Sequence, residues 1–373
     1  MLSQLFGNET VVGIDIGSNT IKAMQLEPSG TGWKVTNAAI QQTPPESCRD
    51  CAITMILDVG QAIKSLLKSS GIRCTKAVAA ISGSQVIVRQ VQMPRMSEAS
   101  LRKSIRYEAS RYISTSMENN VVEFEILGDV PDTDQMNVML VAAPTEVVES
   151  RVQVLEAAGL EPIAIDVEAF SIIRSLVEAS TDEEMHSKTI AIVDIGASHT
   201  DVNIVANGKF ALTRSIPIAG DSFTNSIRTL TGFSFEDAER MKFEMAAQSS
   251  IDKLSTSDGE SKSWRVVQPL LDELLREIRR SNQFYQQQFP EGADHATVSS
   301  IILVGGSSRM PGMAAYVESK LNIPTRIGDA FSGQINPGRY DQDFVDDYGP
   351  VFVIAAGLAL KEEMAKSKLP KAA

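Results

Sequence analysis

Two stretches decide the fold of this chain: "VVGIDIGSNTIKAMQL" at residues 11–26 and "IAIVDIGASHTDVNIV" at residues 190–205. Each consists of a β-branched run, the triplet Asp-Ile-Gly, a few small or polar residues and a second apolar run. Apolar runs separated by a short glycine-containing segment are typical of two antiparallel strands joined by a tight turn. The sequence therefore predicts the same β-hairpin twice, and hence a chain built from two related lobes.

The overall composition is that of a globular protein with an acidic surface. A length of 373 residues is long for one core and favours two linked lobes. The net charge of −12 argues against a nucleic-acid partner, because an acidic surface repels phosphate backbones. No apolar run of about 18 residues occurs, and the opening "MLSQLFGNE" lacks the basic start and apolar core of a secretion signal. We therefore expect a cytoplasmic protein that inserts into no membrane.

Two short clusters each have a functional and a structural interpretation. Cys48 and Cys51 form a C-x-x-C motif, which could hold a metal or act in redox chemistry. Because no second cysteine pair accompanies it, we favour a chance occurrence in a loop. The stretch "YDQDFVDDYG" has four aspartates between residues 341 and 347. For these we favour a solvated loop over a loop that binds a divalent ion.

Strand patterns alternate with amphipathic helices along the chain, which predicts an α/β fold. We expect Gly71 to end a first helix, Ser97 to cap a second, and Thr145 and Gly159 to bound a third. The polar, serine-rich residues 248–264 are expected to form a mobile surface loop. The remaining expected elements are strands in 32–42, 76–94, 121–130, 136–144 and 300–306, and helices over 53–70, 97–113, 145–159, 220–232, 234–246, 266–289 and 349–365.

The two hairpins have the composition of a phosphate-binding pair. Asp15 and Asp194 stand at strand ends, where their carboxylates can reach Mg²⁺ or its waters. A glycine-containing turn exposes backbone N–H groups that can cradle phosphate oxygens. One hairpin from each lobe would thus grip a polyphosphate from opposite sides. In "ILVGGSSRMPGM", Gly305 and Gly306 allow a nucleoside to approach bare backbone, and Ser307 or Ser308 can cap the next helix.

The order of hairpin, second hairpin, "GGSSRMPG" and C-terminal "AAGLAL" resembles the actin-like ATPase superfamily over nearly the whole chain. The segments "IAGDSF" and "AERMKFE" look like its bacterial shape-determining and cell-division branch. Within that branch, "LFGNETVVGIDIGSNTIKAMQL", "VQMPRMSEASLRKSIRYEASRYI" and "GLEPIAIDVEAFSIIRSL" resemble the PilM family of type IV pilus assembly proteins.

This resemblance implies a duplicated, two-lobe actin-like (ribonuclease H-like) fold, with a nucleotide cleft between the lobes and an inserted subdomain of the type found in the division protein FtsA. The first core subdomain (1A) would comprise residues 1–85, 166–187 and 346–373, and the inserted subdomain (1C) residues 86–165. The second core subdomain (2A) would comprise residues 188–225 and 296–345, and the adenosine-side subdomain (2B) residues 226–295.

The same resemblance implies that ATP or ADP binds with Mg²⁺. Asp15 and Asp194 would hold the metal's waters, and Glu239 and Lys242 would contact the ribose and base, although the pair could equally be a helical surface pair. Asp201 would organise the metal or the attacking water, or point into solvent. The remaining implied nucleotide-binding residues are Gly17, Ser18, Asn19, Lys22, Gly196, Ala197, Ser198, Thr200, Gly220, Gly305, Gly306, Ser307, Arg309 and Met310.

Hydrolysis depends on the segment "IDVEAFSII". An ungapped comparison puts Val167 where the superfamily has its water-orienting acid or amide, with Asp166 and Glu168 on either side. Asp166 could equally cap a helix, and Glu168 could be a first-turn charge favoured by the helix dipole. We therefore expect slow hydrolysis or none by the isolated chain.

The partner that the resemblance implies is the N-terminal cytoplasmic segment of the membrane protein PilN, bound in a groove of the inserted subdomain and the neighbouring lobe. The chain would then be a scaffold at the inner membrane, in contact with other platform or motor proteins. One alternative is a self-associating, membrane-bound filament former like FtsA, although the ending "EEMAKSKLPKAA" has little of an amphipathic anchor. Another is a small-molecule kinase. The basic residues of 97–113 give only modest support to a partner surface.

Overall fold

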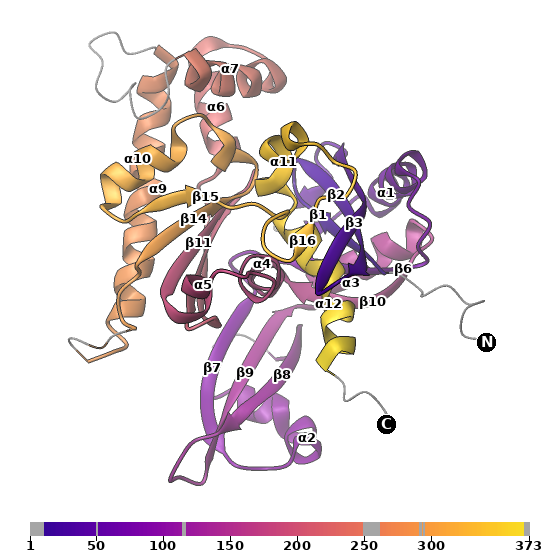
Figure 1. Cartoon of the computed structure of the whole chain (residues 1–373), viewed down its shortest axis with the longest axis vertical. Coiled ribbons are helices and arrows are strands. Elements are labelled where there is room, and N and C mark those ends of the chain that lie inside the picture. Colours follow the sequence, from indigo (N-terminus) through magenta and orange to yellow (C-terminus); the bar gives the residue numbers. More distant parts are fainter. Residues whose placement is uncertain are drawn as a thin grey trace.

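The computed structural model describes residues 11–49, 51–113, 117–248, 262–290, 293 and 295–368. Its first lobe is built on a mixed six-stranded sheet in the order β10-β6-β1-β2-β3-β16 (Figure 1). Helices α1 (Ile56–Ser70) and α3 (Thr145–Ala157) cover one face, and α12 (Val353–Lys368) packs on the other. The strands are β1 (Val11–Ile16), β2 (Thr20–Ser29), β3 (Gly32–Gln42), β6 (Lys76–Ile81), β10 (Glu161–Val167) and β16 (Ile335–Asn336).

The second lobe repeats this plan with a five-stranded sheet in the order β13-β12-β11-β14-β15 (Figure 1). Its outer face packs against α6 (Gly220–Thr231), α9 (Lys262–Gln286) and α10 (Met313–Leu321) through a core that includes Phe223, Trp264 and Tyr316. Its inner face shares one apolar cluster with α12 and the first sheet, so a continuous core joins the lobes. The strands are β11 (Thr189–Ile195), β12 (Thr200–Ala206), β13 (Lys209–Ile216), β14 (Ser300–Val304) and β15 (Thr325–Ile327).

The inserted subdomain is a three-stranded sheet, in the order β7-β9-β8, with α2 against one face. It projects from the two lobes (Figure 1). It comprises β7 (Ile87–Pro94), α2 (Glu98–Ala109), β8 (Asn120–Asp129) and β9 (Gln135–Pro144). The predicted range 86–165 also includes α3, which packs on α1, and residues 161–165 of β10, a strand of the first sheet. The predicted range 296–345 likewise includes β16, which pairs with β3 of the first sheet.

Several local predictions can be compared directly with the structure. Gly71 ends α1 in the left-handed conformation, and Ser97 caps α2, as expected. Thr145 is not the cap of α3, since it is already the first helical residue and Pro144 precedes it. The predicted acidic loop is wrong, because Asp341 caps a helix, α11 (Gln342–Tyr348). Most of the predicted loop 248–264 lies outside the described residues, while α9 already begins at Lys262.

The other elements are short, apart from the 14-residue helix α7. None of the helices in the described part of the chain combines the length and apolarity that crossing a membrane requires. The remaining elements are β4 (Cys48–Arg49), β5 (Ala52–Ile53), α4 (Glu168–Ile173), the π-helix η1 (Arg174–Glu178), α5 (Glu183–Ser187), α7 (Phe235–Gln248), and the 3₁₀ helices η2 (Gly306–Arg309) and η3 (Gly349–Val351).

Candidate functional site

The two predicted hairpins are present and share one register. In the first, Asp15 pairs across the strands with Lys22, and in the second Asp194 pairs with Asp201 at the corresponding position. Like charges placed directly opposite each other in an antiparallel pair destabilise their ionised forms. Burial, followed by the charges of Asp201 and Asp15, raises the pKa of Asp194 to about 7. Two hairpins of the same shape thus have different electrostatics at the same position.

The hairpin turns face each other across the cleft between the lobes. Each turn is closed by its glycine, because the Gly17 N–H donates to the Thr20 carbonyl at 3.1 Å and the Gly196 N–H donates to the His199 carbonyl at 3.2 Å. The hydroxyl oxygens of Ser18 and Ser198 lie 2.9 Å apart and join the two turns directly. The structure thus places the phosphate-binding segments that the sequence predicts on opposite walls of one cleft.

This cleft contains a cavity of about 220 Å³. Most of the predicted site residues line it, from both lobes, although they are scattered over nearly three hundred positions of the sequence. These residues are Asp15, Gly17, Ser18, Asn19, Lys22, Glu168, Asp194, Gly196, Ala197, Ser198, Asp201, Gly220, Glu239, Lys242, Gly305, Gly306, Ser307 and Arg309.

Three predicted residues lie elsewhere. Asp166 is held away from the cavity by Arg174 at 3.0 Å and Lys361 at 3.2 Å, so the prediction that it orients a water at the phosphates is wrong. The Thr200 side chain is fully buried, where its hydroxyl donates to the Ile218 carbonyl at 2.7 Å. Met310 is buried in the core of the second lobe. Asp166 and Thr200 lie in strands and Met310 follows a 3₁₀ helix, and the local sequence pattern did not separate them from their cavity-lining neighbours.

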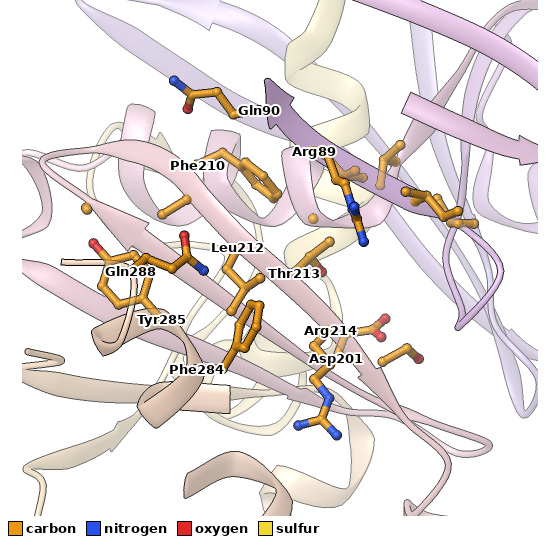
Figure 2. A pocket seen from close by; sticks show the side chains of 18 of the residues that line it. Arg89, Gln90, Asp201, Phe210, Leu212, Thr213, Arg214, Phe284, Tyr285 and Gln288 are labelled. Atoms are coloured by element: carbon orange, nitrogen blue, oxygen red, sulfur yellow. The ribbon is translucent and has the colours of Figure 1, made fainter. Parts of the chain in front are cut away.

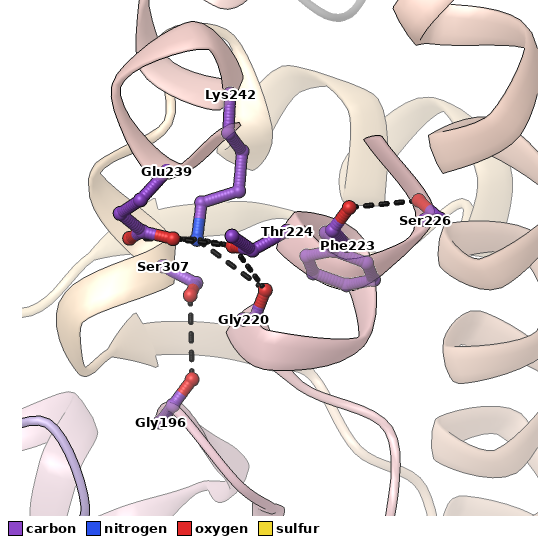
Figure 3. A network of polar contacts seen from close by, with 8 residues as sticks. All are labelled: Gly196, Gly220, Phe223, Thr224, Ser226, Glu239, Lys242 and Ser307. Atoms are coloured by element: carbon purple, nitrogen blue, oxygen red, sulfur yellow. Dashed lines mark hydrogen bonds and ion pairs between the residues drawn. The ribbon is translucent and has the colours of Figure 1, made fainter. Parts of the chain in front are cut away.

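A buried lysine organises the adenosine side of the predicted site. Lys242 is 1% exposed, and its ammonium group donates to Glu239 at 2.7 Å, to the Thr224 hydroxyl at 3.1 Å and to the Gly220 carbonyl at 3.4 Å. Figure 3 shows this network at the start of α6. The Thr224 hydroxyl also donates to Glu239. Lys242 therefore fixes the direction of the Glu239 carboxylate, which remains partly exposed to the cavity.

Glu168, the first residue of α4, is the predicted acid that does reach the cleft. Burial, followed by the charge of Asp15, raises the pKa of its carboxyl to about 8. Among the residues that the structure describes, its carboxylate has no hydrogen-bond or ion-pair partner. Near neutral pH and without a cation, Glu168 is therefore mostly protonated and a poor general base.

The sequence analysis missed His199, Arg151 and Ser82, which also line the cavity. Burial lowers the pKa of His199, but its hydrogen bond to Asp201 and the nearby carboxylates outweigh this effect and raise the pKa to about 9. Arg151 is 4% exposed, and its Nε donates to the Ala80 carbonyl at 3.3 Å. Its position on the apolar face of α3 was a signal in the sequence, because a buried charge usually has a specific role.

Cys48 and Cys51 also line this cavity, although the sequence analysis placed them in an ordinary loop. They lie in and beside the β4–β5 hairpin, and neither forms a disulfide among the described residues. The structure therefore puts the C-x-x-C motif at the wall of the predicted nucleotide cleft.

The cavity lining fits a nucleotide with a divalent cation. Gly306 faces open space, because no atom of the described chain lies within 4 Å of the position where its Cβ would be. At Gly305, by contrast, a Cβ would lie 2.1 Å from Asp194 Oδ1, so the bare backbone of β14 can approach the hairpin closely. Asp15 and Asp194 would offer the oxygen ligands that Mg²⁺ prefers, and Lys22 and Arg309, which also line the cavity, would offer positive charge to phosphates.

A larger cavity, of about 1180 Å³, adjoins the cleft and shares Ser82 and Asp201 with it. We call it the groove. Figure 2 shows Arg89 and Gln90 of β7 on one side, and residues of β13 and α9 on the other. Its lining includes the aromatic residues Phe210, Phe284, Tyr285 and Phe289 and the basic residues Arg89, Lys209, Arg214 and Arg280.

The duplicated lobes, the paired hairpins and the cleft between them define the actin-like ATPase fold. The chain matches the family described as "Type IV pilus assembly protein PilM" over residues 13–363. It therefore belongs to the type IV pilus assembly PilM family, and both the predicted family and the predicted fold class are confirmed.

Known proteins support this assignment. A solved structure titled "PilM-PilN type IV pilus biogenesis complex" is 26% identical, with a TM-score of 0.80 over 94% of this chain and 98% of that chain. The cell division protein FtsA of Pseudomonas aeruginosa is 24% identical over 372 residues, which cover 89% of this chain and 85% of FtsA. MreB5 of Spiroplasma citri bound to AMPPNP is 14% identical, with a TM-score of 0.51 over 96% of this chain and 98% of that chain, and shows likeness of fold alone.

Proposed function

We propose that this chain is a nucleotide-binding scaffold of the type IV pilus machinery that holds the N-terminal cytoplasmic segment of PilN in the groove. The observation that carries this proposal is a large groove beside the inserted subdomain in a chain of the PilM family. The solved PilM-PilN complex is similar over nearly the whole chain, which supports PilN as the partner. The scaffold would be cytoplasmic and held at the inner membrane by PilN, where it meets other platform or motor proteins.

The groove suits an extended peptide. Within the described chain, β7 pairs only with β9 and β13 pairs only with β12, so each strand has one free edge. Residues of both strands line the groove. A free strand edge offers unpaired backbone N–H and C=O groups to an added strand, and side pockets then select the peptide's residues. Phe284 is 56% exposed and Phe289 is 38% exposed, so both are open to an apolar side chain of the peptide.

The cleft would bind ATP or ADP with Mg²⁺. Asp15 and Asp194 would hold the metal's waters, the two hairpin turns would cradle the phosphates, and Glu239 would face the ribose. Bound Mg²⁺ would neutralise the phosphate charge that these carboxylates otherwise repel. Because Val167 stands where the superfamily has its water-orienting acid or amide, and Asp166 lies outside the cavity, we expect the isolated chain to hydrolyse ATP slowly or not at all.

A second candidate function is an FtsA-like filament former, because FtsA of Pseudomonas aeruginosa is similar over most of both chains. That function requires ATP-dependent self-association, which sedimentation measures directly. A small-molecule kinase is a weaker alternative, and it would require ATP turnover that a small polar substrate stimulates.

The test is a titration of the purified protein with a synthetic peptide of the PilN cytoplasmic tail from the same genome, with and without Mg-ATP. We expect one peptide per chain, and about ten-fold weaker binding by Phe284→Ala, which removes an aromatic contact in the groove. Phe233→Ala is the matched control, because Phe233 is 44% exposed and lies outside the groove.

Equal peptide affinity of Phe284→Ala and the wild type would place the peptide outside the groove. Absence of peptide binding by the wild type under both conditions would overturn the scaffold function. ATP-dependent sedimentation would then test the filament.

A further inference from the structure

Three side chains of the kinds that bind metals meet at the junction of the cleft and the groove. Glu168 comes from the first lobe, at the start of α4, and His199 and Asp201 come from the second hairpin. One candidate ligand atom from each residue lies within 4.8 Å of those of the other two. These three residues therefore come together from both lobes to form one cluster.

The histidine ring is held in an orientation that suits a ligand. Its Nδ1 lies 2.9 Å from the Ser198 hydroxyl, while its Nε2 lies 3.4 Å from Asp201 Oδ2 and 2.9 Å from the Ser82 hydroxyl. A hydrogen bond to one ring nitrogen typically fixes the ring of a metal-binding histidine so that the other nitrogen faces the metal. Nε2 is therefore the atom aimed at the carboxylates.

Carboxylates crowd this point, with the side chains of Lys22, Arg151 and His199 beside them. Four carboxylates lie near one another, and the Lys22 ammonium group bonds to one of them, Asp15, at 3.0 Å. The Glu168 carboxylate has no hydrogen-bond or ion-pair partner within the described ranges. Crowded carboxylates of this kind are stabilised by a cation of high charge. The four carboxylates are those of Asp15, Glu168, Asp194 and Asp201.

The donor set differs from that of the predicted Mg²⁺ site. Asp194 Oδ1 lies toward Gly305, and Asp15 is paired with Lys22. Mg²⁺ prefers oxygen ligands, whereas an imidazole nitrogen beside two carboxylates favours first-row transition metals such as Mn²⁺ and Co²⁺. From this arrangement we propose that Glu168, His199 and Asp201 form a second divalent-cation site that selects a transition metal over Mg²⁺ and links the two lobes.

A metal at this site would join the two lobes, since Glu168 belongs to one and His199 and Asp201 belong to the other. Adjacent ligand atoms of an octahedral ion lie about 3 Å apart, and His199 Nε2 already lies 3.4 Å from Asp201 Oδ2. The metal replaces the contact between His199 and Ser82, so it acts at the boundary that the cleft and the groove share. The site requires neither a nucleotide nor a peptide, so it stands or fails separately from the proposed function.

The experiment is a titration of nucleotide-free, full-length protein, first dialysed against a chelator, with Mn²⁺, Co²⁺ or Mg²⁺ alone. Electron paramagnetic resonance measures free Mn²⁺, visible absorption measures bound Co²⁺, and calorimetry measures Mg²⁺. We expect one tight Mn²⁺ per chain, bound at least about ten-fold more tightly than Mg²⁺. His199→Asn should weaken Mn²⁺ binding at least about ten-fold and change the Co²⁺ spectrum, with little effect on Mg²⁺.

His186→Asn is the matched control, because His186 lies in α5, outside both cavities, and should leave Mn²⁺ binding unchanged. Glu168→Gln removes a ligand from the other lobe and should weaken Mn²⁺ binding to a similar extent, so the test stands if His199→Asn fails to fold. Equal affinity of the wild type for Mn²⁺ and Mg²⁺ would overturn the site. Wild-type Mn²⁺ affinity in the folded ligand variants would overturn it as well.

Discussion

Asp15 and Asp194 occupy the same place in the two hairpins, but their cross-strand neighbours differ in charge. Lys22 neutralises Asp15 at 3.0 Å, whereas Asp201 faces Asp194 and, after burial, is the largest cause of its raised pKa. At the scale of single residues, the two hairpins therefore differ: one carboxylate is paired with a lysine, and the other faces a second carboxylate. A cleft with this asymmetry holds negative charge that a bound cation would balance.

Lys242 allows a residue-scale prediction about the adenosine side. Lys242→Met leaves Glu239 and Thr224 without the ammonium group that joins them. Breaking a buried ion pair from one side is costly, so we expect the free energy of unfolding to fall by about 3 kcal/mol. ATP binding should also weaken, because the Glu239 carboxylate loses its fixed direction. Denaturant unfolding and nucleotide titration measure the two effects.

The control for this variant is Arg240→Met on the same helix. The Arg240 side chain is 67% exposed and pairs only at the surface, with Asp237 and Glu244 among the described residues. Its replacement should change the free energy of unfolding by less than about 0.5 kcal/mol. An equal fall in the free energy of unfolding in the two variants would contradict the stabilising role of the buried Lys242 ammonium group.

At the scale of elements, the strand-to-helix connection after β14 (Ser300–Val304) packs closely against the end of β11 in the same lobe. Gly305 has a φ of 85°, in the left-handed region that favours glycine, while Gly306 begins η2 and faces the cavity. The two adjacent glycines thus have different reasons to lack a side chain: one packs against protein, and the other borders open space.

Alanine at each of these glycines should separate stability from binding. In Gly305→Ala, the new Cβ would lie 2.1 Å from Asp194 Oδ1 and 2.7 Å from the Ile195 carbonyl, so we expect a clear fall in melting temperature. In Gly306→Ala, the methyl group meets no atom of the described chain within 4 Å, so the melting temperature should stay close to wild type. Nucleotide affinity should nevertheless fall, because the methyl group occupies the cavity wall.

Thermal unfolding and titration with an ATP analogue give both readouts on the same samples. An unchanged nucleotide affinity in a folded Gly306→Ala protein would show that the nucleoside lies elsewhere. A melting temperature of Gly305→Ala equal to that of Gly306→Ala would contradict the packing explanation.

At the scale of the whole molecule, the cleft and the groove are neighbours. Ser82 and Asp201 line both cavities, and His199 contacts each of them. The two lobes and the inserted subdomain therefore meet at the boundary between the proposed nucleotide cleft and the groove. Any ligand that moves the second hairpin also moves a wall of the groove.

We therefore predict that Mg-ATP changes the affinity for the PilN-tail peptide, and that the peptide changes the affinity for Mg-ATP by the same factor, as linkage requires. Ser82→Ala should reduce this coupling, because it removes the 2.9 Å contact between the Ser82 hydroxyl and His199 Nε2. Each ligand alone should bind the variant nearly as it binds the wild type. Peptide titrations with and without Mg-ATP, on both proteins, measure the coupling; a coupling in the variant equal to that in the wild type would contradict this role for Ser82.

The sequence by itself determined the fold class, the two hairpins and most of the cleft. Asp-Ile-Gly between apolar runs occurs twice, and glycine and aspartate are typical turn residues, so the repeat rather than either copy indicated the fold. Local signals were equally sufficient where one residue caps a helix, as Ser97 and Gly71 do. The family resemblance then supplied Glu239 and Lys242, whose roles local patterns alone leave open.

Only the tertiary structure decided which neighbours of these residues face the cleft. Asp166 and Glu168 are two positions apart, yet one pairs with Arg174 and Lys361 and the other enters the cavity. Which of the two residues faces the cavity depends on where β10 ends and α4 begins, and packing sets such boundaries. The residues that line the groove and the meeting of Glu168 with His199 and Asp201 were equally hidden, because they come from segments that lie far apart in the sequence and are joined by non-local contacts.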